Sequence, residues 1–430
     1  MLMPRLIYTV LFYLLSPAYF ARLLWRGFGN KAYWYRWNER LGTTKILPSL
    51  NKSVIWIHAV SVGEVNASIP LIRSLLGNYP DAEVLVTTST PTGSEMLLNR
   101  LGGRVKHQYM PIDLPFFINK FLDNWNPKIL IILETEIWPN LITICKERGI
   151  FISLVNARLS EKSKQRYIRY LPLIQPIIKK INLILAQYKS DADRFKELCE
   201  ESKIVLCGNI KFDQEIPLGL ADISKSIKES WSVEGKLRPT LIGASTHDSE
   251  EQVLVDAFID IKKVFKDALM IIVPRHPERF KSVHMLLKEN RMNIALRSRQ
   301  DEMDSSKDVL LGDTMGELNL LYSLSDVAFV GGSLIDHGGQ NLLEPASLSL
   351  PIATGPYLRN FQEIASELKK QGALSVISNS KDLSSYFIGL MNEDKKRELT
   401  GKAAYEVFIK NRGTLKKIIK ELSGPLSKIF

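Results

Sequence analysis

The chain has 430 residues, which is too long for one ordinary domain and predicts two domains of roughly 150–200 residues each. Hydrophobic residues make up 45% of it and charged residues 24%, a composition that excludes a disordered chain. Its three cysteines, Cys145, Cys199 and Cys207, have no paired short spacing, which argues against a disulfide framework or a zinc site. A reducing compartment fits this pattern.

The net charge of +11 is concentrated at the N-terminus, where Met1–Lys52 carries eight Lys or Arg against the single acid Glu39. Nucleic-acid binding is one reason for a basic protein, but the uncharged run Leu6–Phe20 favours another. The run is followed by aromatic and basic residues, in the order expected from acyl chains to anionic headgroups: Arg22, Trp25, Arg26, Lys31, Tyr33, Trp34, Tyr35, Arg36, Trp37 and Arg40. We therefore expect an anionic lipid surface as partner, and no nucleic acid.

Leu6–Phe20 has fifteen residues, fewer than the roughly 17–25 that span a bilayer. A membrane anchor over residues 1–26, spanning or interfacial, is the favoured interpretation. A cleaved signal peptide has the wrong flanking charges, and a core helix is the remaining alternative. If the segment spans, the basic residues that follow it place the main body in the cytoplasm.

From Ser53 onward, short apolar runs that end in polar residues alternate with amphipathic stretches. Strands are expected at Val54–Ile57, Glu83–Val86, Ile129–Leu133, Phe151–Val155 and Leu183–Ala186, and then at Thr240–Gly243, Ala268–Val273, Asp308–Leu311, Val327–Val330 and Pro351–Ala353. Helices are expected at Asn66–Leu76, Asn140–Arg148, Glu317–Ser325 and in the tail Asp394–Ile429. The alternation is typical of the α/β class with parallel, doubly wound sheets.

The alternation lapses over Phe212–Pro239, a polar stretch typical of an interdomain connection. We expect one Rossmann-like domain over residues 27–215, a linker over 216–238 and a second Rossmann-like domain over 239–430. In such open sheets the ligand crevice lies beyond the carboxyl ends of the strands.

Acidic residues follow two strands of the first domain. Glu64 lies at the first strand-to-helix turn and could act as a general base toward a hydroxyl; alternatively it only complements the helix dipole. Glu134 and Glu136 follow an otherwise apolar strand, where acids are costly unless they face the crevice or cap the next helix. Lys211 could neutralise a carboxylate or phosphate near the domain junction, or could simply be solvated.

Glycine-containing loops precede two expected helix starts in the second domain, Gly312–Gly316 before Glu317 and His337–Gly339 before Asn341. Helix N-termini carry free N–H groups and partial positive charge, which suit a phosphate. Glu344, beside the second loop, could accept hydrogen bonds from sugar hydroxyls. This pattern is typical of half of a nucleotide-sugar site.

Arg275, in the loop Pro274–Arg279, offers the planar donor fork that phosphates and carboxylates accept. His247 and His276 raise the question of a metal, yet the six histidines lack ligand spacing and no metal site is expected. No P-loop signature, GxGxxG or GxSxG motif is present.

Together the motifs resemble a known family, the 3-deoxy-D-manno-octulosonic acid (Kdo) transferases of Gram-negative bacteria. The resemblance covers nearly the whole chain, in family order, through HAVSVGE, TTSTPTGSE, LETEIWPN, NARLSEKS, GNIKFD, GASTHDSEE, VPRHPERF, GDTMGEL, FVGGSL and NLLEP. It implies a two-domain GT-B fold and an inverting glycosyltransferase of lipopolysaccharide core biosynthesis. The donor would be CMP-Kdo, with no separate cofactor, and the acceptor a tetra-acylated lipid A precursor (lipid IVA) at the cytoplasmic side of the inner membrane.

The resemblance also implies roles for individual residues. Glu64 matches the general base, and Glu134 and Lys211 match positions that stabilise the transition state. The CMP-binding positions would be Pro274, Arg275, Met315, Gly316, Glu317, Asn341, Leu342, Leu343 and Glu344. The chemistry is expected in the cleft between the domains. The number of Kdo units added is left open.

Two other functions compete with this one. A sugar-nucleotide 2-epimerase has the same two-domain architecture but does not explain the N-terminus. A non-catalytic protein that binds anionic lipid leaves the acids at the strand ends unexplained.

Overall fold

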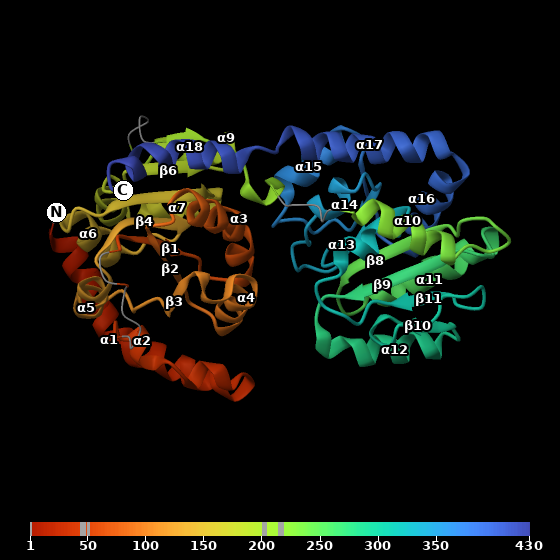
Figure 1. Ribbon diagram of the computed structural model, residues 1–430, viewed down its shortest axis with the longest axis horizontal. Helices are drawn as coiled ribbons and strands as arrows, with labels where there is room; N and C mark the ends of the chain where they lie inside the picture. Colours follow the sequence, from red (N-terminus) through yellow and green to blue (C-terminus); the bar gives the residue numbers. More distant parts are fainter. Residues whose placement is uncertain (1, 44–48, 50–51, 200–203, 214–218) are drawn as a thin grey trace. The chain divides into compact units, whose positions relative to one another are not determined.

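The computed structural model describes residues 2–43, 49, 52–199, 204–213 and 219–430. The chain forms two compact units, each drawn in Figure 1. Unit 1 comprises Met1–Gln214 together with Arg412–Phe430, and unit 2 comprises Glu215–Asn411. Both units are α/β, with one parallel sheet each, as the alternating pattern of the sequence predicts.

The sheet of unit 1 has seven strands in the order β3-β2-β1-β4-β5-β6-β7, and every neighbouring pair is parallel. Its strands are β1 (Val54–His58), β2 (Glu83–Thr88), β3 (Lys106–Tyr109), β4 (Pro127–Leu133), β5 (Phe151–Ala157), β6 (Leu183–Ala186) and β7 (Ile204–Leu206). The strand order reverses between β1 and β4. At such a switch point successive connections leave on opposite faces and open a crevice at the carboxyl ends.

Helices cover both faces of this sheet. One hydrophobic cluster packs on it from α5 (Pro115–Trp125), α6 (Pro139–Glu147), α8 (Leu171–Ile178) and α9 (Lys189–Lys196). The other packs from α3 (Val62–Asn78), α4 (Pro91–Leu101) and α18 (Thr414–Ser427). The remaining helical elements are α1 (Leu2–Gly29), η1 (Lys31–Trp34), α2 (Trp37–Arg40), η2 (Gly102–Arg104), α7 (Glu161–Arg169) and η4 (Ile210–Asp213).

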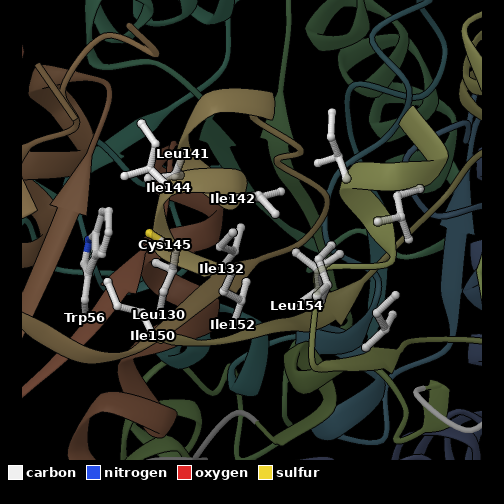
Figure 2. Close-up of a cluster of buried hydrophobic side chains, with 14 of the residues drawn as sticks. Trp56, Leu130, Ile132, Leu141, Ile142, Ile144, Cys145, Ile150, Ile152 and Leu154 are labelled. Carbon is white, nitrogen blue, oxygen red and sulfur yellow. The ribbon is translucent and has the colours of Figure 1, made fainter. Parts of the chain in front are cut away.

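The first of these clusters explains why the central strands are apolar without interruption. Figure 2 shows Trp56 of β1 and Leu130 and Ile132 of β4 packed with Leu141 and Ile144 of α6. A strand covered on both faces cannot alternate polar and apolar residues, so its only polar positions are at its ends. That constraint leaves the ends of the strands for acids, such as Glu134 directly after β4.

Unit 2 repeats the plan with a seven-stranded parallel sheet in the order β10-β11-β9-β8-β12-β13-β14. Its strands are β8 (Thr240–Thr246), β9 (Leu269–Pro274), β10 (Ile294–Leu296), β11 (Val309–Leu311), β12 (Val327–Val330), β13 (Ile352–Thr354) and β14 (Leu374–Val376). The order reverses between β8 and β12, which is the switch point of this unit.

The two faces of the second sheet are also covered. Helices α11 (Glu250–Val264), α12 (Phe280–Glu289) and α16 (Ser380–Asn392) supply one hydrophobic cluster. Residues from α10 (Leu220–Ser230) and α13 (Leu318–Ser323) join the other. The remaining helical elements are η5 (Pro277–Arg279), η6 (Arg297–Arg299), α14 (Leu343–Ser347), α15 (Gln362–Lys370) and α17 (Asp394–Lys410).

The unit boundaries differ from the sequence-based division at two places. The expected linker 216–238 contains α10, whose Ile227 and Trp231 pack against the core of unit 2; residues 216–218 lie outside the described part of the chain. The expected second domain, 239–430, ends too late, because α18 buries Ile418 and Leu422 in the core of unit 1. Phe212–Pro239 is rich in polar residues, so the composition of this stretch does not indicate that α10 has one apolar face.

Capping interactions fix α18 to unit 1. Asp213 Oδ1 accepts a hydrogen bond from the Gly413 N–H at 2.6 Å, and Asp213 Oδ2 accepts one from the Leu415 N–H. Gly208 lies so close that a Cβ there would stand 2.5 Å from Thr414 Oγ1, and its φ of +104° favours glycine as well. The C-terminal helix is therefore part of the first unit.

We expect Leu422→Ala to lower the free energy of unfolding of unit 1 by about 2–5 kcal/mol, since it leaves a cavity in a packed core. Leu422 is fully buried in α18. Tryptophan fluorescence during urea unfolding measures the effect, because six of the seven tryptophans lie in unit 1, all except Trp231.

Leu399→Ala, at an exposed position of α17, is the matched control and should change the transition by no more than about 0.5 kcal/mol. An unshifted tryptophan transition in Leu422→Ala would mean that α18 does not stabilise unit 1.

Candidate functional site

Two acids flank the switch point of unit 1. Glu64 lies in the first turn of α3, directly after β1, and Glu134 follows the last residue of β4. Strands β1 and β4 are hydrogen-bonded neighbours, with Ile57 paired to Ile131. The acids that the sequence places at two separate strand ends therefore come to one edge of the sheet.

Glu64 is 9% exposed and accepts two hydrogen bonds. Its Oε2 accepts from the Val60 N–H at 2.7 Å and its Oε1 from the Ser61 hydroxyl at 3.0 Å, so it does complement the start of α3. Burial, together with the negative charges of Glu134 and Glu136, nevertheless raises the pKa of Glu64 to about 7 against the effect of these two donors. A carboxyl group with this pKa exchanges its proton near neutral pH.

Glu134 and Lys211 form an ion pair at the same edge. Lys211 Nζ lies 3.4 Å from Glu134 Oε1, and both side chains are partly exposed. Glu134 has a φ of +57°, an uncommon conformation for a residue with a side chain. The η4 turn that carries Lys211 is held by Asn156, whose Oδ1 accepts from the Ile210 N–H at 3.0 Å. The pair is thus fixed by the backbone of two strand ends.

A pocket of about 340 Å³ opens at these acids. Its lining residues are Glu64, Glu134, Thr135, Glu136, Arg158, Leu159, Ser160, Ser163 and Tyr167. The pKa of Glu136 is raised by burial, although Trp138 Nε1 donates to its Oε2 at 2.8 Å. Burial, with the charge of Glu136, raises the pKa of Tyr167 to about 12. The pocket lining therefore combines acidic side chains with hydroxyl groups and one arginine.

Tyr167 is a pocket residue that the sequence did not single out. It lies on the short helix α7, and no local motif distinguishes it from an aromatic residue of the core. Its neighbours in the pocket, Arg158 and Ser160, belong to the NARLSEKS segment that carries part of the family resemblance.

In unit 2 a buried carboxylate organises the loop after β12. Glu250, the first residue of α11, is fully buried. Its oxygens accept hydrogen bonds from four backbone N–H groups at 2.7–2.9 Å, those of His247, Gly332, Ser333 and Leu334. A Cβ at Gly331 would stand 2.6 Å from Ser245 O, so the loop passes too close for any other residue. These N–H groups are occupied by the protein's own carboxylate.

Arg275 and Glu344 interact in the same unit. Arg275 follows β9 and is exposed, while Glu344 lies in the first turn of α14. Burial raises the pKa of Glu344, whereas a hydrogen bond from Asn341 Nδ2 at 3.2 Å and the positive charge of Arg275 lower it. The structure therefore brings three of the expected nucleotide-site residues together.

The other expected positions contribute differently. Leu342 and Leu343 are fully buried and Pro274 ends β9, so only their backbone groups could meet a ligand. Glu317 is paired with Arg297, with Nη2 and Oε1 2.7 Å apart.

The loop before Glu317 is open. Met315 is 64% exposed, and Gly316 has a φ of +87°. Helix α13, expected over Glu317–Ser325, has only six residues, and α14, which starts after the second glycine-containing loop (His337–Gly339), has five. Their N-terminal dipoles are correspondingly weak.

Within the described ranges, no group of three or more His, Cys, Asp or Glu side chains is placed to hold a metal ion. His247, His276 and His337 do approach one another in unit 2, through ring contacts. The side-chain amide nitrogen of Gln340 lies 3.3 Å from His247 Nε2.

A family model and two relatives of this chain carry the same description. A family model described as 3-deoxy-D-manno-octulosonic-acid transferase (kdotransferase) matches residues 35–214. A 3-deoxy-D-manno-octulosonic acid transferase of Haemophilus influenzae is 38% identical over 426 residues, 99% of this chain and 99% of that protein. A probable mitochondrial 3-deoxy-D-manno-octulosonic acid transferase of Arabidopsis thaliana is 33% identical over 382 residues, covering 88% and 85%.

Among solved structures, the UDP-GlcNAc 2-epimerase of Neisseria meningitidis bound to UDP-GlcNAc has a TM-score of 0.59 and 15% identity, covering 86% of this chain and 100% of that one. At that identity the likeness shows the GT-B fold alone, and it gives the epimerase alternative no further support. By contrast, the sequence identity of 38% over 99% of both chains is high enough to show the family. The chain belongs to the 3-deoxy-D-manno-octulosonic acid (Kdo) transferase family and is a glycosyltransferase.

Proposed function

We propose that this chain transfers Kdo from CMP-Kdo to a tetra-acylated lipid A precursor, with inversion at the anomeric carbon. The family gives the transferred sugar. The observation that carries the mechanism is Glu64, a carboxylate with a pKa of about 7 that lines a pocket large enough for part of a sugar.

Glu64 is proposed to act as the general base. It takes the proton from an acceptor hydroxyl as the hydroxyl oxygen bonds to the anomeric carbon of Kdo. A base with a pKa near the working pH is available in its deprotonated form and still accepts a proton readily. The acids Glu134 and Glu136 strengthen this base, because their charges disfavour a third negative charge nearby.

Lys211 is proposed to stabilise the transition state together with Glu134. Its ammonium group is held by Glu134 at 3.4 Å yet remains partly exposed. A fixed cation that remains accessible can stabilise negative charge as it develops, without a large rearrangement. Glu134 orients the ammonium group of Lys211, and its negative charge balances the positive charge of that group.

The donor is proposed to bind unit 2, and the acceptor unit 1. The bond between the anomeric carbon and the phosphate breaks, and CMP leaves with both electrons of that bond. Arg275 is proposed to bind the phosphate, because its planar fork matches two phosphate oxygens. Beside it, Asn341 Nδ2 donates a hydrogen bond to Glu344 Oε1, and Glu344 also interacts with Arg275. We propose that this reaction is metal-independent, with the charge stabilised by Arg275 and Lys211.

Helix α1 is proposed to attach the protein to the cytoplasmic side of the inner membrane. Pro4–Gly29 is long and apolar enough to cross a membrane. Large apolar side chains along it face solvent: Leu6, Ile7, Val10, Leu11, Leu14, Leu15, Leu24, Trp25 and Phe28 are each at least half exposed. The basic residues that follow suit anionic headgroups.

Contacts at both ends of α1 support an interfacial arrangement. Near its start the Tyr8 hydroxyl donates to the buried Asp113 at 2.9 Å. Near its end Phe20 stacks on Trp37, with ring centroids 5.3 Å apart, and Trp37 belongs to α2, which contacts β3. A helix tied to one globular unit at both ends keeps these contacts only if it lies along the membrane surface.

Glu64→Gln should lower kcat by roughly 10²–10⁴, since the amide cannot accept the proton. The measurement is CMP release from CMP-Kdo in the presence of acylated acceptor. Glu95→Gln, at an exposed position of α4, is the matched control. Near-normal turnover in Glu64→Gln would remove Glu64 from the role of base.

The pH profile gives an independent check. Because the deprotonated form is active, kcat/KM for the acceptor, measured at saturating CMP-Kdo, should rise tenfold per pH unit below about 7, the pKa of Glu64, and level off above it. The residual activity of Glu64→Gln should lack this acidic limb. A limb that persists unchanged in the variant would assign it to another group.

Leu14→Glu combined with Trp25→Glu should release the protein from vesicles that contain anionic lipid, because both side chains are more than 70% exposed on α1. Vesicle flotation measures the bound fraction. Leu399→Glu, on the exposed side of α17, is the control and should still float.

An N-terminal tag distinguishes the two arrangements of α1. In inside-out membrane vesicles, the tag should be cleaved by added protease if α1 lies along the surface. A protected tag would show that α1 spans the membrane.

A further inference from the structure

Three histidines from three separate loops meet in unit 2. His247 follows β8, His276 follows β9 and His337 lies in the loop after β12. The ring of His247 lies 4.5 Å from that of His337, at an interplanar angle of 31°, and 5.4 Å from that of His276, edge to face. Strands β9, β8 and β12 are consecutive in the sheet, so the cluster lies at the carboxyl edge of its switch point.

The cluster is layered from buried to exposed. His247 is buried, and in this arrangement its Nε2 accepts from the Gln340 amide at 3.3 Å. His276 and His337 are exposed. The pKa of His247 is lowered, first by burial and then by the nearby His337, with smaller contributions from His276 and Arg275. Protonation of His247 is therefore disfavoured until a negative charge arrives.

The carboxylates around the cluster already have partners. Glu250 raises the pKa of His247, but its oxygens accept four backbone N–H groups. Asp336, beside His337, pairs with Arg359 at 2.6 Å. Glu344 interacts with Arg275 and Asn341. Four groups that can be cationic, Arg275 and the three imidazoles, therefore gather beside Glu250 and Asp336, which have other partners, and Glu344, which interacts with Arg275.

We propose that His247, His276 and His337 form the subsite for the carboxylate of the Kdo group in the donor. This assignment rests on the proposed function, in which Arg275 binds the phosphate of CMP-Kdo. Kdo carries its carboxylate on the anomeric carbon itself, one bond from the oxygen that links it to the phosphate. A phosphate on Arg275 therefore brings the carboxylate within reach of the adjoining His276.

The chemistry accounts for sugar selectivity. A carboxylate on the anomeric carbon separates Kdo from neutral hexoses, and imidazolium N–H groups bind it through charge-assisted hydrogen bonds. His276 and His337 donate hydrogen bonds to the carboxylate. The buried His247 packs against the ring of His337 and holds that ring in position. A carboxylate binds imidazolium more tightly than neutral imidazole, so donor binding weakens as the pH rises.

The test compares CMP-Kdo with CMP, which lacks the carboxylate. His337→Ala and His276→Ala should each raise KM for CMP-Kdo by about 10- to 100-fold, the loss of one hydrogen bond to a charged group. The inhibition constant of CMP should remain within about twofold of the wild-type value. His284→Ala, on α12 outside the cluster, is the matched control and should change neither constant.

A pH series separates recognition from a structural role. In the wild-type protein, KM for CMP-Kdo should rise above neutral pH while the CMP inhibition constant does not follow it. In His337→Ala this pH dependence should be reduced. Equal weakening of CMP and CMP-Kdo, or no change in KM in either variant, would overturn the subsite. A wild-type protein that does not use CMP-Kdo at all would instead contradict the proposed function.

Discussion

Removal of the Glu64 carboxyl group from water is the physical condition on which the proposed chemistry depends. At the carboxyl end of β1 it is 9% exposed, lies near two further acids and accepts hydrogen bonds from two donors. Desolvation and like charge therefore outweigh the donors, and the pKa rises to about 7. The doubly covered sheet makes this possible, because its apolar strands leave only their ends for acids.

The two units contain a comparison that isolates this effect. Glu64 and Glu250 both occupy the first turn of the helix that follows the switch-point strand of their unit, β1 and β8. Glu250 is the more deeply buried, but four backbone N–H groups satisfy it and hold the glycine loop in place. Glu64 has one backbone donor, one hydroxyl and a pocket. Hydrogen-bond supply, rather than burial alone, separates a structural carboxylate from one suited to proton transfer.

Much of the fold follows from the sequence, and the missed strands share one position in the sheets. The ten expected strands correspond to the central strands of both sheets, which are continuous apolar runs. The four missed strands, β3, β7, β10 and β14, are the edges. Strand β3, with the sequence KHQY, carries no apolar run, and β7, β10 and β14 have three residues each, which is short for a recognisable pattern. The packing of α18 on unit 1 cannot be predicted from the sequence either, because it depends on contacts between apolar residues that are far apart in the chain.

For the site, local sequence predicted the acids at strand ends but not their partners. The gathering of Glu64 and Glu134 follows from strand order, which the pattern of apolar runs does not specify. The role of Glu250 was missed because a glutamate at a helix start has an ordinary local explanation. The sequence places His337 in a glycine-containing turn, and only the three-dimensional structure brings it to His247. The catalytic and nucleotide-binding roles given to individual residues remain predictions.

The most direct test of the account is the titration of Glu64 itself, followed by infrared difference spectroscopy with the Glu64→Gln spectrum as the reference. The account predicts that the protonated carboxyl band disappears with a midpoint at about pH 7. It also predicts that Glu134→Gln moves the midpoint to lower pH, because one neighbouring negative charge is gone. A midpoint near 4.5, the ordinary value for a glutamate, would contradict the central claim.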